Sequence, residues 1–179
     1  MVKLRPFTHS DISRILELIT FNVASMLEKV PFPYTRDCAE FFLTTVCIKN
    51  DSFTRAVVVN NELVGCVSLD GITGDETRQA SIGYWIGEEY WGKGYATKAA
   101  ELVIEYGFNS LQLDTIIGEH FVDNPGSRRV MEKCHFVPFP ASEKENELKS
   151  PSLGRNGKLI PIKRLKLSRR NWSAHKVNK

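Results

Sequence analysis

The chain of 179 residues contains no apolar run of about 18 residues, the length that predicts a membrane-spanning helix. Its first residues, Met1 to Pro6, include no apolar core of the kind that secretory signals carry. Cysteine is scarce, since four are present, with no Cys-x-x-Cys pair and no pairing with histidine at metal-ligand spacing. These absences predict a cytoplasmic protein with no membrane partner, no bound metal ion and free thiols.

A large excess of one charge is also missing. The 24 Lys and Arg residues against 21 Asp and Glu residues give a net charge of +3, so nucleic acid is not an expected partner. The late basic residues are interpreted as a solvated strand face and a basic C-terminal tail at residues 168–179. An apolar content of 42% predicts a single globular domain over residues 1–179, and the sequence leaves monomer and homodimer open.

The spacing of apolar residues predicts a mixed α/β fold, with a central mixed sheet and helices on both faces. Strands are expected over residues 2–7, 53–59, 63–69, 80–86, 115–121 and 159–167. Helices are expected from Ser10 or Asp11 as a cap, from Thr35 to about Val46, from the glycine-rich turn at residues 91–97 to about Phe108, and over residues 125–134. Asn60-Asn61 predicts a hairpin turn. Residues 138–157 are predicted to form a loop.

One apolar pattern is ambiguous. The alternation within the last predicted strand changes parity between Ile162 and Leu165. Because successive side chains of a strand point to opposite faces, this change predicts either a bulge or burial on both faces.

A glycine-rich turn is the most informative motif. Trp91-Gly92-Lys93-Gly94-Tyr95-Ala96-Thr97 follows the strand predicted at 80–86 and opens a helix. Glycine lets the backbone approach a ligand closely, and the N–H groups of a first helical turn attract anions. An ordinary tight turn is the alternative. The motif predicts a site for the diphosphate of a cofactor.

Several motifs resemble those of the GNAT acetyltransferase superfamily and follow one another in the same order along the chain. Their residues are similar to those of its RimJ/RimL branch. In that superfamily an Arg/Gln-x-x-Gly-x-Gly/Ala turn follows a strand. Here Trp91 to Ala96 fill the six places, with Trp91 where Arg or Gln is usual. The other matching segments are Asn22-Val23, Pro31-Phe32-Pro33-Tyr34, Ile82-Gly83-Tyr84-Trp85-Ile86, Asn124-Pro125-Gly126-Ser127 and Leu167-Ser168-Arg169-Arg170-Asn171-Trp172.

The resemblance implies the GNAT acyl-CoA N-acyltransferase fold, with a mostly antiparallel sheet and acetyl-CoA as co-substrate. It implies that the strand at 80–86 splays from the strand at 115–121, that the pantetheine arm lies in the gap, and that an N–H near Ile86 or Gly87 donates to the thioester oxygen. Asn124 is either a pantetheine ligand or a plain helix cap, or both. The implied cofactor-binding residues are Trp85, Ile86, Trp91, Gly92, Lys93, Gly94, Tyr95, Ala96, Thr97 and Asn124.

The catalytic residues follow less directly. Ser127 resembles the serine placed near the departing thiolate in the RimL branch. The general base stays open, because many relatives have a glutamate where this chain has Ser81. Glu119, His120 and Asp70 are the alternatives, and strand alternation places Glu119 and His120 on opposite faces. Ser127 and Glu119 are the predicted catalytic residues.

The expected function is transfer of acetyl from acetyl-CoA to a primary amine, by direct attack in a ternary complex. No cysteine is placed for a covalent acetyl-enzyme. A peptide N-terminus is the first choice of acceptor, followed by a small amine such as a polyamine. The alternative is a module that binds acetyl-CoA or CoA without turnover.

Overall fold

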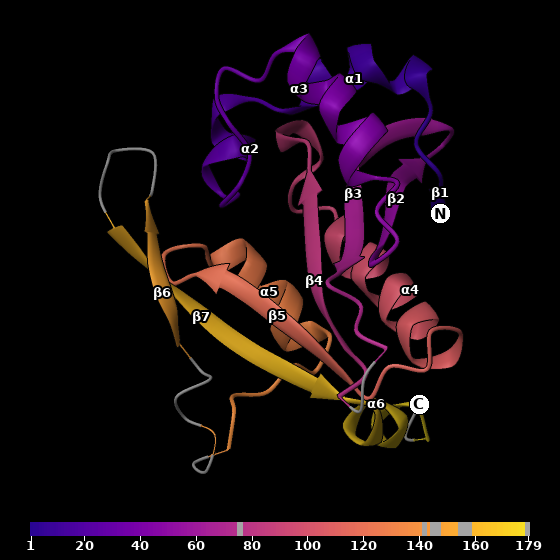
Figure 1. Cartoon of the computed structure of the whole chain (residues 1–179), viewed down its shortest axis with the longest axis vertical. Helices are drawn as coiled ribbons and strands as arrows, with labels where there is room; N and C mark the ends of the chain where they lie inside the picture. Colours follow the sequence, from indigo (N-terminus) through magenta and orange to yellow (C-terminus); the bar gives the residue numbers. More distant parts are fainter. Residues whose placement is uncertain (75–76, 141–142, 144–147, 154–158, 178–179) are drawn as a thin grey trace.

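The computed structural model describes residues 1–74, 77–140, 143, 148–153 and 159–177 of the chain. A seven-stranded sheet runs through the molecule in the order β1-β2-β3-β4-β5-β7-β6 (Figure 1). The strands are β1 Val2–Arg5, β2 Ser52–Val59, β3 Glu62–Asp70, β4 Gln79–Ile86, β5 Thr115–Phe121, β6 Leu148–Leu153 and β7 Leu159–Ser168. Neighbours are antiparallel except β4 and β5, which are parallel. The predicted mixed, mostly antiparallel sheet is confirmed.

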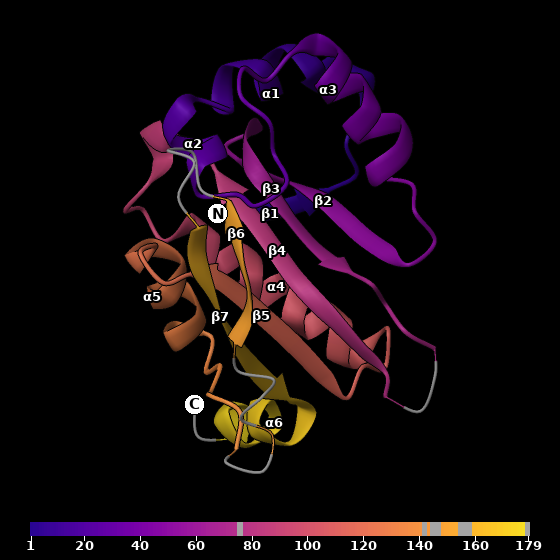
Figure 2. The same ribbon diagram turned by 60° about the vertical axis from the view of Figure 1, so that its left-hand side comes forward.

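Helices cover both faces of this sheet. They are η1 His9–Asp11, α1 Ile12–Leu18, α2 Phe21–Ser25, α3 Arg36–Phe41, η2 Phe42–Val46, η3 Glu88–Tyr90, α4 Tyr95–Asn109, α5 Pro125–Lys133 and α6 Arg169–Val177. One core joins α1, α2 and α3 to strand residues such as Ala56 and Val58. The other joins α4 and α5 to residues such as Val57 and Leu69. Figure 2 shows the two groups of helices on opposite sides of the sheet.

Alternation along β2 explains the two cores. Neighbouring residues point to opposite faces, so Ala56 and Val57 bury their side chains in different cores, and both are fully buried. The α1 and α3 side is called the front face below, and the α4 and α5 side the back face. By the same register Ser81, Gly83 and Trp85 lie on the front face.

The first helical region differs from the prediction. Asp11 makes no side-chain bond that caps α1. Its carboxylate instead accepts hydrogen bonds from the Thr8 N–H at 2.8 Å and the Arg5 guanidinium at 2.7 Å. The chain leaves the helix at Ile19 and starts α2 with Thr20 as its cap. The helix predicted from Thr35 begins as expected but changes to a π-helix at Phe42.

The elements predicted for the middle of the chain are confirmed, and those predicted for its C-terminal part are confirmed in part. Asn60 and Asn61 both have positive φ, as a type I′ hairpin requires. The β5–β7 register runs without a shift, so the parity change in β7 reflects burial on both faces, with Ile162 opposite Phe121 and Leu165 opposite Gly118.

The loop predicted over 138–157 is wrong where β6 forms, because β6 pairs with the otherwise free edge of β7. Residues 141–142, 144–147 and 154–158 of that prediction lie outside the described residues. The segment predicted as a basic tail includes α6, whose Trp172 ring lies 5.1 Å from that of Phe108, while residues 178–179 are again outside the description. None of the helices described has the length and apolar content that a bilayer crossing needs.

The feature that positions the site is a split between β4 and β5. The two strands pair from Gln79 with Thr115 up to Ile82 with Gly118, and the pairing stops there. Beyond this point β4 stays with β3, whereas β5 stays with β7 (Figure 1). Residues 83–86 of β4 therefore present an edge without a β5 partner.

Candidate functional site

The glycine turn follows β4 after the short helix η3 and leads into α4. Gly92 and Gly94 have φ of 75° and 77°, a left-handed conformation that favours glycine. A Cβ built on either glycine meets no atom within 4 Å, so backbone conformation rather than crowding selects glycine here. The first-turn N–H groups of Tyr95, Ala96 and Thr97 have no acceptor inside the helix, as at every helix start. An open, donor-rich turn of this kind fits a diphosphate.

Trp91 ties this turn to β4. Its indole Nε1–H donates to the carbonyl oxygen of Ile86 at 2.7 Å, although the indole is partly exposed. The residue that replaces the usual Arg or Gln therefore has a defined contact with the strand end. At the other end of the turn, Cys134 Sγ of α5 lies 3.9 Å from the carbonyl oxygen of Thr97, so the end of α5 packs beside the start of α4.

The edge of β4 offers backbone groups to the split. The Gly87 N–H donates to the Val64 carbonyl at 2.9 Å, which places it toward β3. Because backbone groups alternate in direction along a strand, the N–H groups of Tyr84 and Ile86 face the split. Of the two predicted oxyanion donors, the Gly87 N–H is already paired with β3 and the Ile86 N–H faces the split, so Ile86 stays the predicted donor.

A hydroxyl pair bridges the split on the back face. Tyr84 projects from β4, and its hydroxyl lies 2.8 Å from Ser127 Oγ and 3.2 Å from the Ser127 carbonyl oxygen. Burial raises the pKa of Tyr84, while the hydrogen bond with Ser127 opposes that shift, so the phenol stays neutral. Asn124 caps α5 by accepting from the Ser127 N–H at 3.0 Å, which confirms its capping role.

Tyr84 is the member of this group that the sequence analysis did not select. The strand alternation could have identified it, because Tyr84 and Trp85 are neighbours and must point to opposite faces of the sheet. Trp85 itself packs against the front core, and Ile86 is buried in the back core. The structure thus brings Tyr84, Asn124 and Ser127 together at the split.

Glu119 is not part of this group. It lies on the front face of β5 and forms an ion pair with Arg164 of β7 at 3.1 Å. His120 points to the back face and is buried, with Nδ1 2.7 Å from the Phe121 carbonyl oxygen. The predicted placement of these two residues on opposite faces is confirmed.

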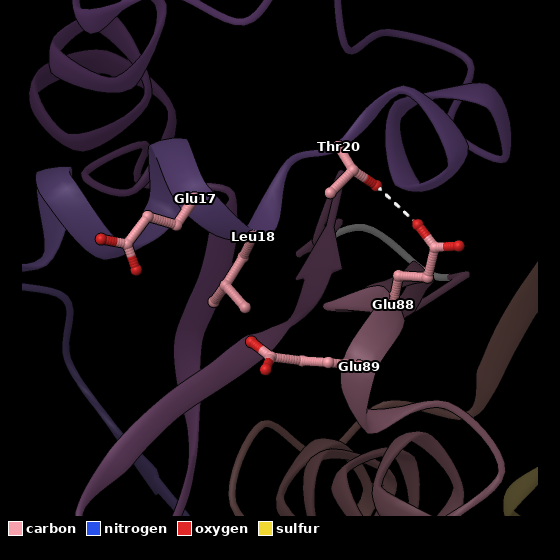
Figure 3. Close-up of a pocket in the computed structure, with 5 residues that line it drawn as sticks. All are labelled: Glu17, Leu18, Thr20, Glu88 and Glu89. Atoms are coloured by element: carbon pink, nitrogen blue, oxygen red, sulfur yellow. Dashed lines mark hydrogen bonds between the residues drawn. The ribbon is translucent and has the colours of Figure 1, made fainter.

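An acidic pocket opens beside the end of β4. The cavity of about 320 Å³ is lined by Glu17, Leu18, Thr20, Glu88 and Glu89 (Figure 3). Gly87 makes room for the Leu18 side chain that lines the pocket, because a Cβ at position 87 would overlap it.

The carboxylates of this pocket have different partners. Arg14 pairs with Glu17 at 2.7 Å and Glu89 at 2.8 Å. Glu88 accepts hydrogen bonds from Thr20 at 3.1 Å and Asn22 at 2.8 Å. Within the described ranges no three His, Cys, Asp or Glu side chains gather closely enough to hold a metal ion.

The sequence of this chain is similar to those of known acetyltransferases. The model of the acetyltransferase (GNAT) domain matches residues 2–137. An uncharacterized N-acetyltransferase p20 of Bacillus licheniformis is 30% identical over 68% of this chain and 64% of its own length. The putative ribosomal N-acetyltransferase YdaF of Bacillus subtilis is 27% identical over 76% of this chain and 78% of its own. Spermidine N(1)-acetyltransferase of Escherichia coli K12 is 35% identical over 63% of this chain and 60% of its own.

A solved structure agrees with these matches. Spermidine N-acetyltransferase of Vibrio cholerae, in complex with CoA and spermine, superposes with a TM-score of 0.81 over 96% of this chain and 98% of its own, at 24% identity. The chain spans less than two thirds of the length of the Bacillus licheniformis relative. With a family match over most of its length and the glycine turn and strand split in place, the chain belongs to the GNAT acetyltransferase family.

Proposed function

We propose that this protein transfers the acetyl group of acetyl-CoA to a primary amine by direct attack in a ternary complex, as an enzyme of the RimJ/RimL type. The acceptor is a protein N-terminal α-amine or a small amine. The observation that carries the proposal is the split, because one unpaired edge of β4 leads from the glycine turn to the Tyr84–Ser127 pair. A long, linear cofactor such as acetyl-CoA needs one continuous surface that binds its diphosphate at one end and its thioester at the other.

The residues at the split fit the parts of acetyl-CoA. The N–H groups of the glycine turn and of the first turn of α4, from Gly92 to Thr97, would hold the diphosphate, with the helix dipole of α4 adding attraction. The backbone N–H and carbonyl of Tyr84, which face the split beside Trp85 and Ile86, would pair with the pantetheine amides, each bond contributing about 1 kcal/mol. Asn124 keeps its capping bond and can offer its side-chain N–H₂ to the same arm.

Acetyl transfer requires that the negative charge on the thioester oxygen be stabilised and that the departing sulfur receive a proton. Acetyl-CoA supplies a thioester whose carbonyl carbon accepts an amine. The Ile86 N–H faces the split and would stabilise the charge on oxygen, an effect worth about 3 kcal/mol for one donor. The Ser127 hydroxyl, oriented by Tyr84, would hold a proton for the departing sulfur.

The acidic pocket supports an amine as the acceptor. A primary amine is an ammonium ion near pH 7, and Glu88 has no cation within ion-pair distance among the described residues. The names of two relatives support the two acceptor classes, since one is a putative ribosomal N-acetyltransferase and another acetylates spermidine. The RimJ/RimL assignment has its support in the ribosomal relative.

A CoA-binding module without turnover is the second candidate. Ser81 carries no carboxylate, and Glu119 is neutralised by Arg164. Release of free thiol from acetyl-CoA separates the two functions, with peptides that have a free α-amine and spermidine as acceptors. The proposal expects release that saturates with one acceptor class. Micromolar binding of CoA by calorimetry, without release for any amine, would establish the module instead.

A further inference from the structure

A half-buried carboxylate lies at the point where β4 and β5 separate. Asp70 ends β3 and is the cross-strand partner of Ser81, so its side chain is on the front face of the sheet. The last paired residue of β4 is Ile82, which makes Gly83 the first residue of the split. A Cβ built on Gly83 would lie 3.5 Å from Asp70 Oδ2 and 3.0 Å from Ser68 Oγ. Because glycine has no side chain, Gly83 leaves Oδ2 of this carboxylate uncovered on its side.

Hydroxyl groups hold Asp70 in place. Ser52 donates to Oδ1 at 2.7 Å, and Ser68 donates to Oδ2 at 2.5 Å. The hydroxyl oxygens of Ser52 and Thr54 are themselves 2.9 Å apart, so the network continues along β2. Each carboxylate oxygen accepts one of these bonds and still has a lone pair for another donor.

No cation neutralises Asp70. Among the described residues, no Lys, Arg or His nitrogen lies within ion-pair distance of its carboxylate, whereas Glu119 pairs with Arg164. The titratable groups around it are Cys66, also on the front face of β3, and Cys47, which follows η2. Burial raises the pKa of both thiols, for Cys47 to about 12, and the negative charge of Asp70 raises both further. Arg55 acts on Cys47 in the opposite direction, without pairing with Asp70.

We infer that Asp70 is the catalytic carboxylate of the front face, which binds the ammonium group of the acceptor and accepts its proton. The inference rests on the proposed function. One N–H bond of the ammonium breaks, the electron pair stays on nitrogen as the nucleophile, and the proton moves to Oδ2. Water then takes the proton and restores the carboxylate. Ser52 and Ser68 act as positioning residues, because they orient Asp70 and do not reach the acceptor.

The test is the pH dependence of kcat/KM for Asp70→Asn, measured by thiol release with the better acceptor of the wild type. Asp51→Asn is the matched control, since Asp51 is an exposed carboxylate close to the same end of the sheet. The inference expects Asp70→Asn to lower kcat/KM about 100-fold or more and to remove the acidic limb of the profile. CoA affinity stays within twofold, and Asp51→Asn behaves as the wild type.

Two outcomes would overturn the inference. An active wild type with Asp70→Asn within threefold of it, and an unchanged acidic limb, would overturn the role of Asp70 alone. An inactive wild type would overturn the proposed function and this inference with it. If Asp70→Asn fails to fold, Gly83→Ala makes the same test, because the methyl group covers Oδ2 and Ser68 Oγ without removing charge. Unchanged kinetics for Gly83→Ala would then refute the role of Asp70.

Discussion

Replacing Tyr84 by Phe removes one hydroxyl and leaves the packed ring in place. That hydroxyl contacts Ser127 twice, at Oγ and at the carbonyl oxygen. A hydrogen bond of this kind contributes about 1 kcal/mol net to the free energy of unfolding. Ser127 is half-buried, so water can replace the lost partner and the cost should stay near that value. For a chain of this size the melting temperature should fall by about 2–4 °C.

A double-mutant cycle with Ser127→Ala sharpens this prediction. Both single variants lose the bond between the two hydroxyls, so the double variant loses it only once. Urea unfolding at equilibrium should therefore give a coupling energy of about 1 kcal/mol. In kcat/KM, Tyr84→Phe should lower the rate of the wild type but add nothing in the Ser127→Ala background. Additivity within about 0.3 kcal/mol in unfolding, or additive losses in kcat/KM, would refute the orienting role of Tyr84.

Three further predictions follow from other parts of the structure. Gly94→Ala should cost roughly 1–2 kcal/mol in urea unfolding and weaken CoA binding in calorimetry, because φ is 77°; an unchanged midpoint would contradict the strain. Burial raises the pKa of Asp11, but hydrogen bonds from Arg5 and Thr8 lower it overall, so its stabilisation is complete above about pH 4 and is lost as the pH falls through the lowered pKa. The difference in unfolding free energy between wild type and Asp11→Asn should therefore shrink below about pH 4, and a constant difference would argue against the ion pair. Hydrogen bonds with Thr35 lower the pKa of Cys38, whereas burial raises that of Cys66, so mass spectrometry should find iodoacetamide on Cys38 first.

Local chemistry made the glycine turn and the α5 cap predictable. Gly92 and Gly94 signal a left-handed turn by themselves, and Asn124 followed by proline marks a helix start. The hairpin at Asn60-Asn61 was predictable for the same reason. In each case the residues that specify the structure are within a few positions of one another.

Features that depend on distant residues were not predictable. The ion pair that neutralises Glu119 needs the register that places Arg164 beside it. The exclusion of Gly87 as an oxyanion donor follows from its bond to Val64 across the β3–β4 ladder. Strand β6 forms because β7 has an edge to pair, although its own sequence, with a proline and two serines, favours a loop. Sheet register decides all three, and periodicity does not reveal it.

The indole of Trp91 has a mechanical consequence. An arginine at this position would be flexible and would let the loop and the strand end move independently. The flat indole has only two side-chain torsions, and its hydrogen bond to Ile86 couples the two. Any displacement of the glycine turn is then transmitted to the carbonyl group of Ile86, the residue whose own N–H faces the reacting carbonyl in the proposed function. Binding of the diphosphate at the glycine turn and alignment of the thioester at Ile86 are therefore coupled through the Trp91 indole.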